Sequence, residues 1–289
     1  MSMNGLKRVS GIGHLALAGL LVLSAFSARA DVAVLVHGYL GNAASWEYSG
    51  VNAALEGAGW PRAGVVVAGP AGPQIIPGPG RQAANKSYSV ELPSIAPVML
   101  QADMLGAMLK RLSAKHPDES IVLVGHSAGG VVARAALVRG QAPGATRLIT
   151  LASPHLGTIR AVQALDYTDD GWPMSWFKEF FSGGIYDVLE DSWGLLLDLV
   201  PPAPGNFLYW LDGQPHPEIQ YVSIVRTGPV GLGDELVPVY SQDMNNVPAL
   251  RGRSEVRVAP AGHLLNPADG LLLAQLLNGA GTVTHGGEK

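Results

Sequence analysis

A serine lies among small residues at 125–130, where the chain reads GHSAGG. The aliphatic run IVLV at 121–124 precedes it, as in a strand covered on both faces of a parallel sheet, and apolar residues at helical spacing follow over 129–139. GHSAG matches G-x-S-x-G, in which the serine occupies a sharp, strained strand-to-helix turn and the glycines let strand and helix approach closely. We therefore predict that Ser127 is a nucleophile and that the amide of Ala128, at the helix N-terminus, lies where negative charge is favoured.

A serine hydroxyl needs a base that removes its proton and an acid that orients the base. In chains with this turn the order is Ser, then Asp or Glu, then His. A strand-like run at 219–225 leads into a glycine-rich loop that carries Asp234, and a run at 254–259 leads into PAGHLLNP, which carries His263. Because the carboxyl ends of parallel strands meet at one edge of a sheet, we predict Asp234 as the acid and His263 as the base of Ser127.

The acid has two alternatives in the same loop region. Glu235 is adjacent to Asp234, and Asp243 lies nine residues further along the chain. Asp234 is preferred because it directly follows a Gly-x-Gly turn at the end of the strand, whereas Asp243 follows another apolar run. His263 is preferred as the base because it follows the last strand.

The reaction also needs amides that stabilise the oxygen anion of a tetrahedral intermediate. The first strand-like run, 32–36, leads into HGYLGNAASW. We predict that the backbone amide of Tyr39 pairs with that of Ala128 as an oxyanion hole. His37 is expected to bond to loop backbone rather than to act as a base.

Alternating strands and helices must position these residues. Such alternation predicts an α/β protein with a mostly parallel sheet of about six strands flanked by helices. The expected strands are 32–36, 64–68, 121–124, 147–151, 219–225 and 254–259, and the expected helices are 46–57, 97–115, 129–139 and 268–278.

Two segments interrupt the alternation. Residues 69–97 are rich in proline and are interpreted as a long loop at the rim of the sheet. Residues 158–217 hold four of the six tryptophans and four of the five phenylalanines, namely Trp172, Trp176, Trp193, Trp210, Phe177, Phe180, Phe181 and Phe207. This aromatic density predicts a helical cap. Its aromatic residues could simply pack against one another, and the cap as a whole could also leave an apolar face over the crevice for an acyl chain.

Composition limits the class of protein. The 289 residues have a net charge of −4 and 15% charged residues, so no basic field indicates nucleic-acid binding. The absence of cysteine excludes disulfides and lipoprotein attachment. One large domain accounts for residues 31–289 without an internal repeat, and the sequence leaves the oligomeric state open.

Residues 1–30 have the pattern of a secretory signal peptide. Lys7 and Arg8 precede an apolar stretch over 11–26, which closes on Ala28-Arg29-Ala30. This pattern predicts cleavage before residue 31 and a secreted or periplasmic protein. A retained membrane anchor is the alternative, but the next strand begins at residue 32, with no linker to clear a bilayer.

The segments LVHGYLGNAASW, VGHSAGG, LASPHLGT, GDELVPVYS and AGHLLNP together resemble the α/β-hydrolase superfamily, and within it bacterial secreted lipases and esterases. The resemblance covers the frame from about residue 32 to the last helix, but not the cap. It implies the α/β-hydrolase fold and the roles assigned above, and it implies no cofactor. Many such lipases hold calcium through an aspartate two residues after the histidine. Leu265 stands at that place, so no metal site is predicted.

These features predict a carboxylic ester hydrolase that acts on lipid or other esters of apolar acyl groups, with transient contact between the cap and a lipid surface. Acyl transfer, thioesterase and amidase activity use the same three residues and stay open as alternatives. An exported lipid-binding protein without activity is disfavoured, because all three positions are chemically competent.

Overall fold

The computed structural model of the protein describes residues 31–170, 185–229 and 231–279. Residues 1–30, which are predicted to be a signal peptide, lie outside the described residues, as do Trp172, Trp176, Phe177, Phe180 and Phe181. Within the described chain, eight strands form one sheet in the order β3-β2-β4-β1-β5-β6-β7-β8. Strand β3 pairs antiparallel with β2, and the other neighbours pair in parallel. The strands are β1 (Asp31–Val36), β2 (Arg62–Val67), β3 (Gln74–Pro77), β4 (Lys86–Val90), β5 (Ser120–His126), β6 (Ala145–Leu151), β7 (Gln220–Arg226) and β8 (Ser254–Ala259).

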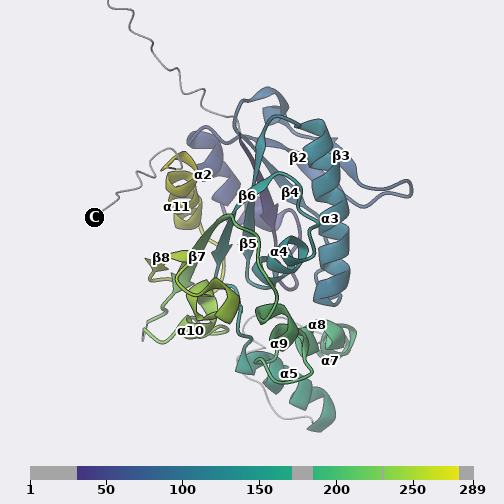
Figure 1. Ribbon diagram of the computed structural model, residues 1–289, viewed down its shortest axis with the longest axis vertical. Coiled ribbons are helices and arrows are strands. Elements are labelled where there is room, and N and C mark those ends of the chain that lie inside the picture. The colour runs from purple at the N-terminus through teal and green to yellow at the C-terminus, as the bar shows by residue number, and fades with distance from the viewer. Residues whose placement is uncertain (1–30, 171–184, 230, 280–289) are drawn as a thin grey trace, which may run out of the picture.

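Helices cover both faces of the sheet (Figure 1). Because side chains alternate along a strand, Val34 packs in the core cluster that contains α3 and α4, while Leu35 packs in the cluster that contains α2 and α11. The helices of the frame are α1 (Ser45–Tyr48), α2 (Val51–Gly57), α3 (Val98–Lys115), α4 (Ala128–Val138), α10 (Val239–Gln242) and α11 (Pro267–Asn278), with 3-10 turns η1 (Pro79–Gln82), η2 (Met244–Asn246) and η3 (Pro248–Leu250). No helix in the described part of the chain is long and apolar enough to span a membrane.

The interpretation of residues 69–97 as one rim loop is wrong, because β3 and β4 lie within that segment and raise the number of strands from about six to eight. Strand β4 reads KSYSV and lacks the apolar run of a buried strand, yet every residue in it is buried. The Lys86 ammonium is 2.6 Å from a Glu119 carboxylate oxygen, and this pairing makes its burial tolerable. Strand β3 lies at the sheet edge, where Pro77 costs no central hydrogen bond.

The helix expected over 46–57 is also interrupted. It divides into α1 and α2 at Gly50, whose φ of 76° lies in the left-handed region that glycine adopts without strain.

A helical insertion between β6 and β7 lies at the end of the molecule opposite to α2 (Figure 1). It contains α5 (Ile159–Asp170), α7 (Ile185–Asp191), α8 (Trp193–Asp198) and α9 (Phe207–Asp212). The polar contacts that join it to the frame include two from helices of the frame: the Arg134 guanidinium of α4 is 2.6 Å from a carboxylate oxygen of Asp212, and the Val98 amide of α3 donates to Asp198 over 2.7 Å. Leu195 and Leu211 extend the core cluster of the frame into the insertion.

Candidate active site

Ser127 forms the turn between β5 and α4. Its φ of 52° and ψ of −129° are unusual for a residue with a side chain. The Ser127 amide donates to the Leu151 carbonyl over 2.8 Å, and the Gly130 amide donates to the Ser127 carbonyl over 3.0 Å. These bonds hold a strained backbone in place, which is the condition under which such strain persists at functional sites.

The glycines of the turn allow this close packing. A Cβ on Gly129 would lie 2.3 Å from the His37 carbonyl oxygen, and one on Gly125 would lie 2.4 Å from the Gly130 Cα. On Gly130 it would lie 2.1 Å from Ser153 Oγ. Close contacts between the turn and its neighbours therefore require glycine at positions 125, 129 and 130.

Gly129→Ala tests this contact. The added methyl group meets backbone carbonyl oxygens, so we expect the free energy of unfolding to fall by about 3 kcal/mol, as for severe overpacking. Urea denaturation measures the change. The matched control is Gly57→Ala in α2, where a Cβ would meet nothing within 4 Å. That variant is expected to be neutral or more stable by up to about 1 kcal/mol, because glycine inside a helix is unfavourable. Equal stabilities of the two variants would contradict the packing argument.

Ser127, His263 and Asp234 form one hydrogen-bonded series. His263 Nε2 lies 2.9 Å from Ser127 Oγ, and His263 Nδ1 lies 3.0 Å from Asp234 Oδ2. The residues come from the turn after β5 and from the loops that follow β8 and β7, so three carboxyl strand ends meet at one edge. Ser127 is 8% exposed and His263 is 4% exposed, which keeps most water away from the bond that joins them.

The environment of Asp234 distinguishes it from the other candidate acids. Its side chain is fully buried, and Oδ1 accepts the Leu236 and Val237 amides over 2.8 and 2.7 Å. Asp243 instead caps η2 by accepting the Asn245 amide over 2.8 Å. Glu235 Oε1 accepts the backbone amide of His263 over 3.0 Å and is not the imidazole's partner. The structure therefore brings Asp234, and neither alternative, to the His263 ring.

The loop after β1 lies against the serine. A Cβ on Gly38 would be 2.7 Å from Ser127 Cβ, so the backbone there directly adjoins the nucleophile. His37 holds this loop, because its Nε2 accepts the Leu92 amide over 3.1 Å and its Nδ1 donates to the Gly38 carbonyl over 3.1 Å. Burial lowers the pKa of His37, which favours the neutral ring that this pair of bonds requires.

The two predicted oxyanion donors flank Ser127. Ala128 is the first residue of α4, where an amide has no acceptor within the helix. Tyr39 follows Gly38 and lines the same cavity as Ser127. Its hydroxyl donates to Ser192 Oγ over 3.0 Å, and this bond ties the loop to the insertion.

A cavity of about 70 Å³ opens beside Ser127 and His263. Most of its wall is apolar and comes from the helical insertion and from the loop that carries Asp234. These wall residues include Ala161, Ala164, Leu196, Leu199, Leu236 and Val237.

Comparisons with known proteins bear on this architecture. A family model described as a PGAP1-like alpha/beta domain matches residues 96–169, which contain α3, β5, α4 and β6. Among solved structures, lipase BlEst2 from Bacillus licheniformis in mature form matches with a TM-score of 0.57 and 16% identity, over 87% of this chain and 92% of that chain. The lin2722 gene product from Listeria innocua matches with a TM-score of 0.57 and 15% identity, over 88% of this chain and 96% of that chain. The chain has the α/β-hydrolase fold.

A metagenomic carboxyl esterase, MGS0156, matches the same fold with a TM-score of 0.52 and 18% identity, over 94% of this chain and 81% of that chain. A comparison with curated protein sequences found no match.

Two residues near the site of this α/β-hydrolase fold were missed by sequence reasoning. His126 Nε2 donates to the His263 carbonyl over 2.9 Å, and the two ring centroids are 5.2 Å apart. Burial first, and then the nearby His263 charge, lower the pKa of His126 to about 3. Gln242 Nε2 lies 3.4 Å from Asp234 Oδ2 and donates to the Val237 carbonyl over 2.7 Å. The signal that could have indicated His126 was its place directly before Ser127 in GHS. No spacing rule indicates Gln242.

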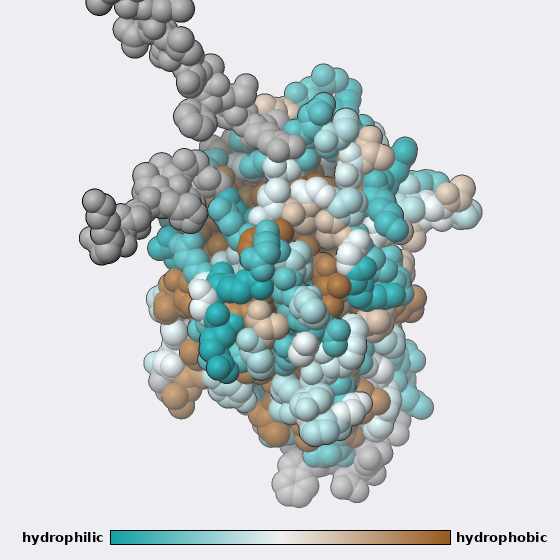
Figure 2. Space-filling view, viewed as in Figure 1, coloured by the Kyte–Doolittle hydropathy of each residue, from teal (hydrophilic) through white to brown (hydrophobic). Residues whose placement is uncertain are grey.

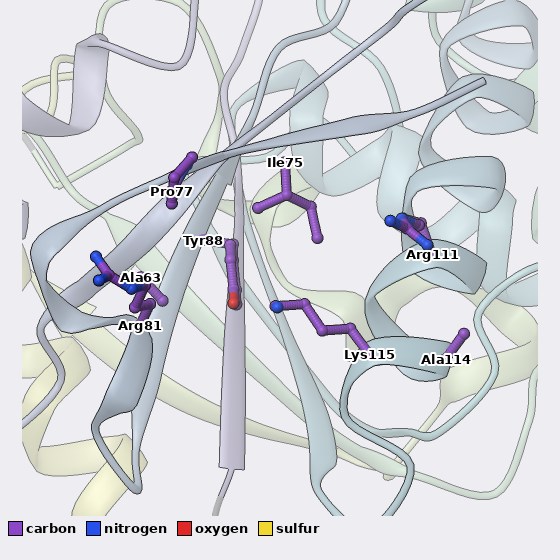
Figure 3. A pocket seen from close by; sticks show the side chains of 8 residues that line it. All are labelled: Ala63, Ile75, Pro77, Arg81, Tyr88, Arg111, Ala114 and Lys115. Carbon is purple, nitrogen blue, oxygen red and sulfur yellow. The ribbon is translucent and has the colours of Figure 1, made fainter. Parts of the chain in front are cut away.

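A different cavity lies between β2, β3, β4 and α3 (Figure 3). Its volume is about 310 Å³, and Arg81, Arg111 and Lys115 line it together with Tyr88. The Tyr88 hydroxyl is 3.0 Å from His116 Nε2, and burial, followed by the Glu119 charge, raises the pKa of Tyr88 to about 12. This phenol is therefore protonated at neutral pH. The cavity is larger than the one at Ser127 but contains neither an activated nucleophile nor its base.

Proposed function

We propose that this protein is a serine hydrolase that cleaves carboxylic esters of apolar acyl groups through an acyl-serine intermediate. The observation that carries the proposal is the series Ser127–His263–Asp234 at the mouth of an apolar cavity. The fold is a frame that many chemistries share, so the support for ester hydrolysis comes from the residues of the site.

The proposed reaction has two halves. His263 takes the Ser127 proton as Oγ attacks the ester carbonyl, and the Tyr39 and Ala128 amides stabilise the resulting oxyanion. The intermediate collapses as His263 gives that proton to the departing alkoxide, which leaves as the alcohol. Water then attacks the acyl-serine with His263 as base, and the acid is released as Ser127 regains its proton. Asp234 keeps the imidazole oriented and stabilises it when it is charged.

The cavity walls support an apolar acyl group as the substrate feature that is recognised. Ala161 and Ala164 are one helical turn apart on α5, and Leu196 and Leu199 are at the same spacing across the end of α8. Their small or aliphatic side chains offer little hydrogen bonding to a polar acyl group. Pockets that enclose a whole drug-sized ligand measure about 300–1,000 Å³, so a cavity of about 70 Å³ fits a short or medium acyl chain.

A series of p-nitrophenyl esters from acetate to palmitate tests the proposed substrate class. Each buried methylene contributes about 0.8 kcal/mol, or about fourfold in kcat/KM, so butyrate, with two more methylenes, is expected to exceed acetate by about 15-fold. Beyond the chain that fills the cavity, kcat/KM is expected to level off. Acetate as the fastest substrate would exclude recognition of an apolar acyl chain. Failure to cleave any of the esters would contradict ester hydrolysis.

We also propose that the protein is exported and touches lipid surfaces transiently through the insertion. The leader at 1–30 supports export. On the insertion, Ile159, Leu197 and Trp210 are exposed. Figure 2 shows apolar residues in several separate groups on one face of the molecule, a distribution that suits brief contact with a surface rather than permanent insertion.

A further inference from the structure

Side chains hold both peptide groups of His263. The His263 carbonyl accepts Nε2–H of His126 over 2.9 Å, and its amide donates to Glu235 Oε1 over 3.0 Å. His126 immediately precedes Ser127, and Glu235 immediately follows Asp234. The residue before the nucleophile and the residue after the acid therefore both form hydrogen bonds with the backbone of His263.

We propose that His126 and Glu235 are positioning residues that set the distance from the His263 imidazole to Ser127 by clamping the His263 peptide. This inference rests on the proposed function, because it assigns the two residues a role in that reaction. Neither residue needs to touch the substrate or exchange a proton with it.

The His263 loop needs such a clamp. In the described chain, the hydrogen bonds that hold the backbone between Gly262 and Leu265 are the two at His263. The ring bonds to Ser127 and Asp234 orient the imidazole, but the peptide determines where its Cα lies. A displacement of about 1 Å at a reacting group can cost about 100-fold in rate, so small loop shifts matter.

His126 suits this role because it is buried and neutral. A carbonyl oxygen only accepts, so Nε2 of His126 must carry the hydrogen. With the pKa of His126 at about 3, the ring is uncharged at neutral pH and adds no second positive charge beside the imidazolium that His263 becomes during catalysis. Its ring centroid is 5.2 Å from that of His263, so a charge there would oppose the reaction.

Glu235 is the weaker half of the clamp. Glu235 is exposed, so water competes for its carboxylate and weakens the hydrogen bond from the His263 amide. A Cβ on Gly262 would lie 3.2 Å from Glu235 Oε2, and the glycine thus leaves room for the carboxylate to reach the His263 amide. We expect removal of Glu235 to have a smaller effect than removal of His126.

The test compares variants that remove or restore each hydrogen bond. His126→Leu removes the donor and keeps the bulk, whereas His126→Gln returns an amide donor near the position of Nε2. We expect His126→Leu to lower kcat for p-nitrophenyl butyrate by about 30–100-fold with KM within about twofold, and His126→Gln to recover about tenfold.

Glu235→Leu is expected to lower kcat by about 3–10-fold, and Glu235→Gln to restore it, because its amide oxygen still accepts. Labelling of Ser127 by a fluorophosphonate should follow the same order.

Matched controls separate positioning from general damage. His116→Leu removes another buried histidine, which precedes the start of β5, whereas His126 is the last residue of that strand. We expect this variant to have a lower unfolding temperature and an unchanged kcat. Glu218→Leu removes a carboxylate that is 91% exposed and should leave kcat unchanged. Should His126→Leu fail to fold, His126→Asn replaces it, because its shorter side chain is polar but does not reach the His263 carbonyl.

The deciding measurement uses a His263→Ala background. There His126→Leu and Glu235→Leu should cause no further loss of the remaining activity, because both residues act through residue 263. The clamp is refuted if either further variant lowers that remaining activity, if His126→Leu keeps kcat within twofold of wild type, or if His126→Gln restores nothing. Retained turnover and labelling in Ser127→Ala and His263→Ala would instead refute the proposed function itself.

Discussion

Ser127→Ala is expected to lower kcat for p-nitrophenyl esters by about 10⁴-fold or more, because it removes the atom that attacks the carbonyl. Alanine keeps the Cβ and is no bulkier than serine, so the turn at φ 52° should persist. The free energy of unfolding should change by less than about 1 kcal/mol, since one hydroxyl is removed. Steady-state kinetics measure the first effect and urea denaturation the second.

The matched control is Ser113→Ala in α3, which removes a hydroxyl near the start of β5, whereas Ser127 follows the end of that strand. Wild-type kinetics are expected for that variant. If Ser127→Ala hydrolysed the esters at the wild-type rate, Ser127 would not be the nucleophile. A fluorophosphonate should label the wild type and Ser113→Ala, and should leave Ser127→Ala unlabelled.

Asp234→Asn is expected to lower kcat by about 10⁴-fold, and the hydrogen bonds of Asp234 give the reason. Oδ1 accepts two backbone amides, from Leu236 and Val237, so the amide oxygen of an asparagine must occupy that place. Its NH₂ group then faces Nδ1 of His263 and requires an unprotonated nitrogen there. The imidazole hydrogen moves to Nε2, which faces Ser127 and can no longer accept the hydroxyl proton.

Asp243→Asn is the control for this change. Asp243 caps η2 through one acceptor bond to the Asn245 amide, and asparagine caps equally well. We expect kcat for Asp243→Asn within about twofold of wild type. The reverse ranking of the two variants in steady-state kinetics would assign the acid to Asp243 instead.

The frame of the fold could be predicted from strands that carry their own signal. Strands β1, β5 and β6 are aliphatic and covered on both faces, so their composition reports their burial. The position of Ser127 after β5 followed from the glycines, whose packing distances leave no room for a side chain. The loops that carry Asp234 and His263 could be placed because each follows a strand in a parallel sheet.

Other features depend on partners that are distant in the sequence. Strand β4 is buried because β1 and β2 flank it and Glu119 pairs with Lys86, and none of these facts is visible in KSYSV. Glu235 was weighed as an alternative acid, and its contact with the His263 amide depends on how two loops meet. The same holds for His126, whose ring bonds a carbonyl 137 residues away along the chain.

The buried Arg134–Asp212 ion pair limits how the insertion can be exchanged between related proteins. Arg134 is on the helix that begins at the nucleophile turn and is completely buried, and Asp212 ends α9. Removing one partner of a buried pair typically costs about 3–5 kcal/mol, because the other charge stays behind without compensation. A chimaera carrying another protein's insertion would therefore need an apolar residue at position 134, or an acid supplied at the matching place. Grafting another insertion onto this scaffold thus requires the residues at positions 134 and 212 to match each other.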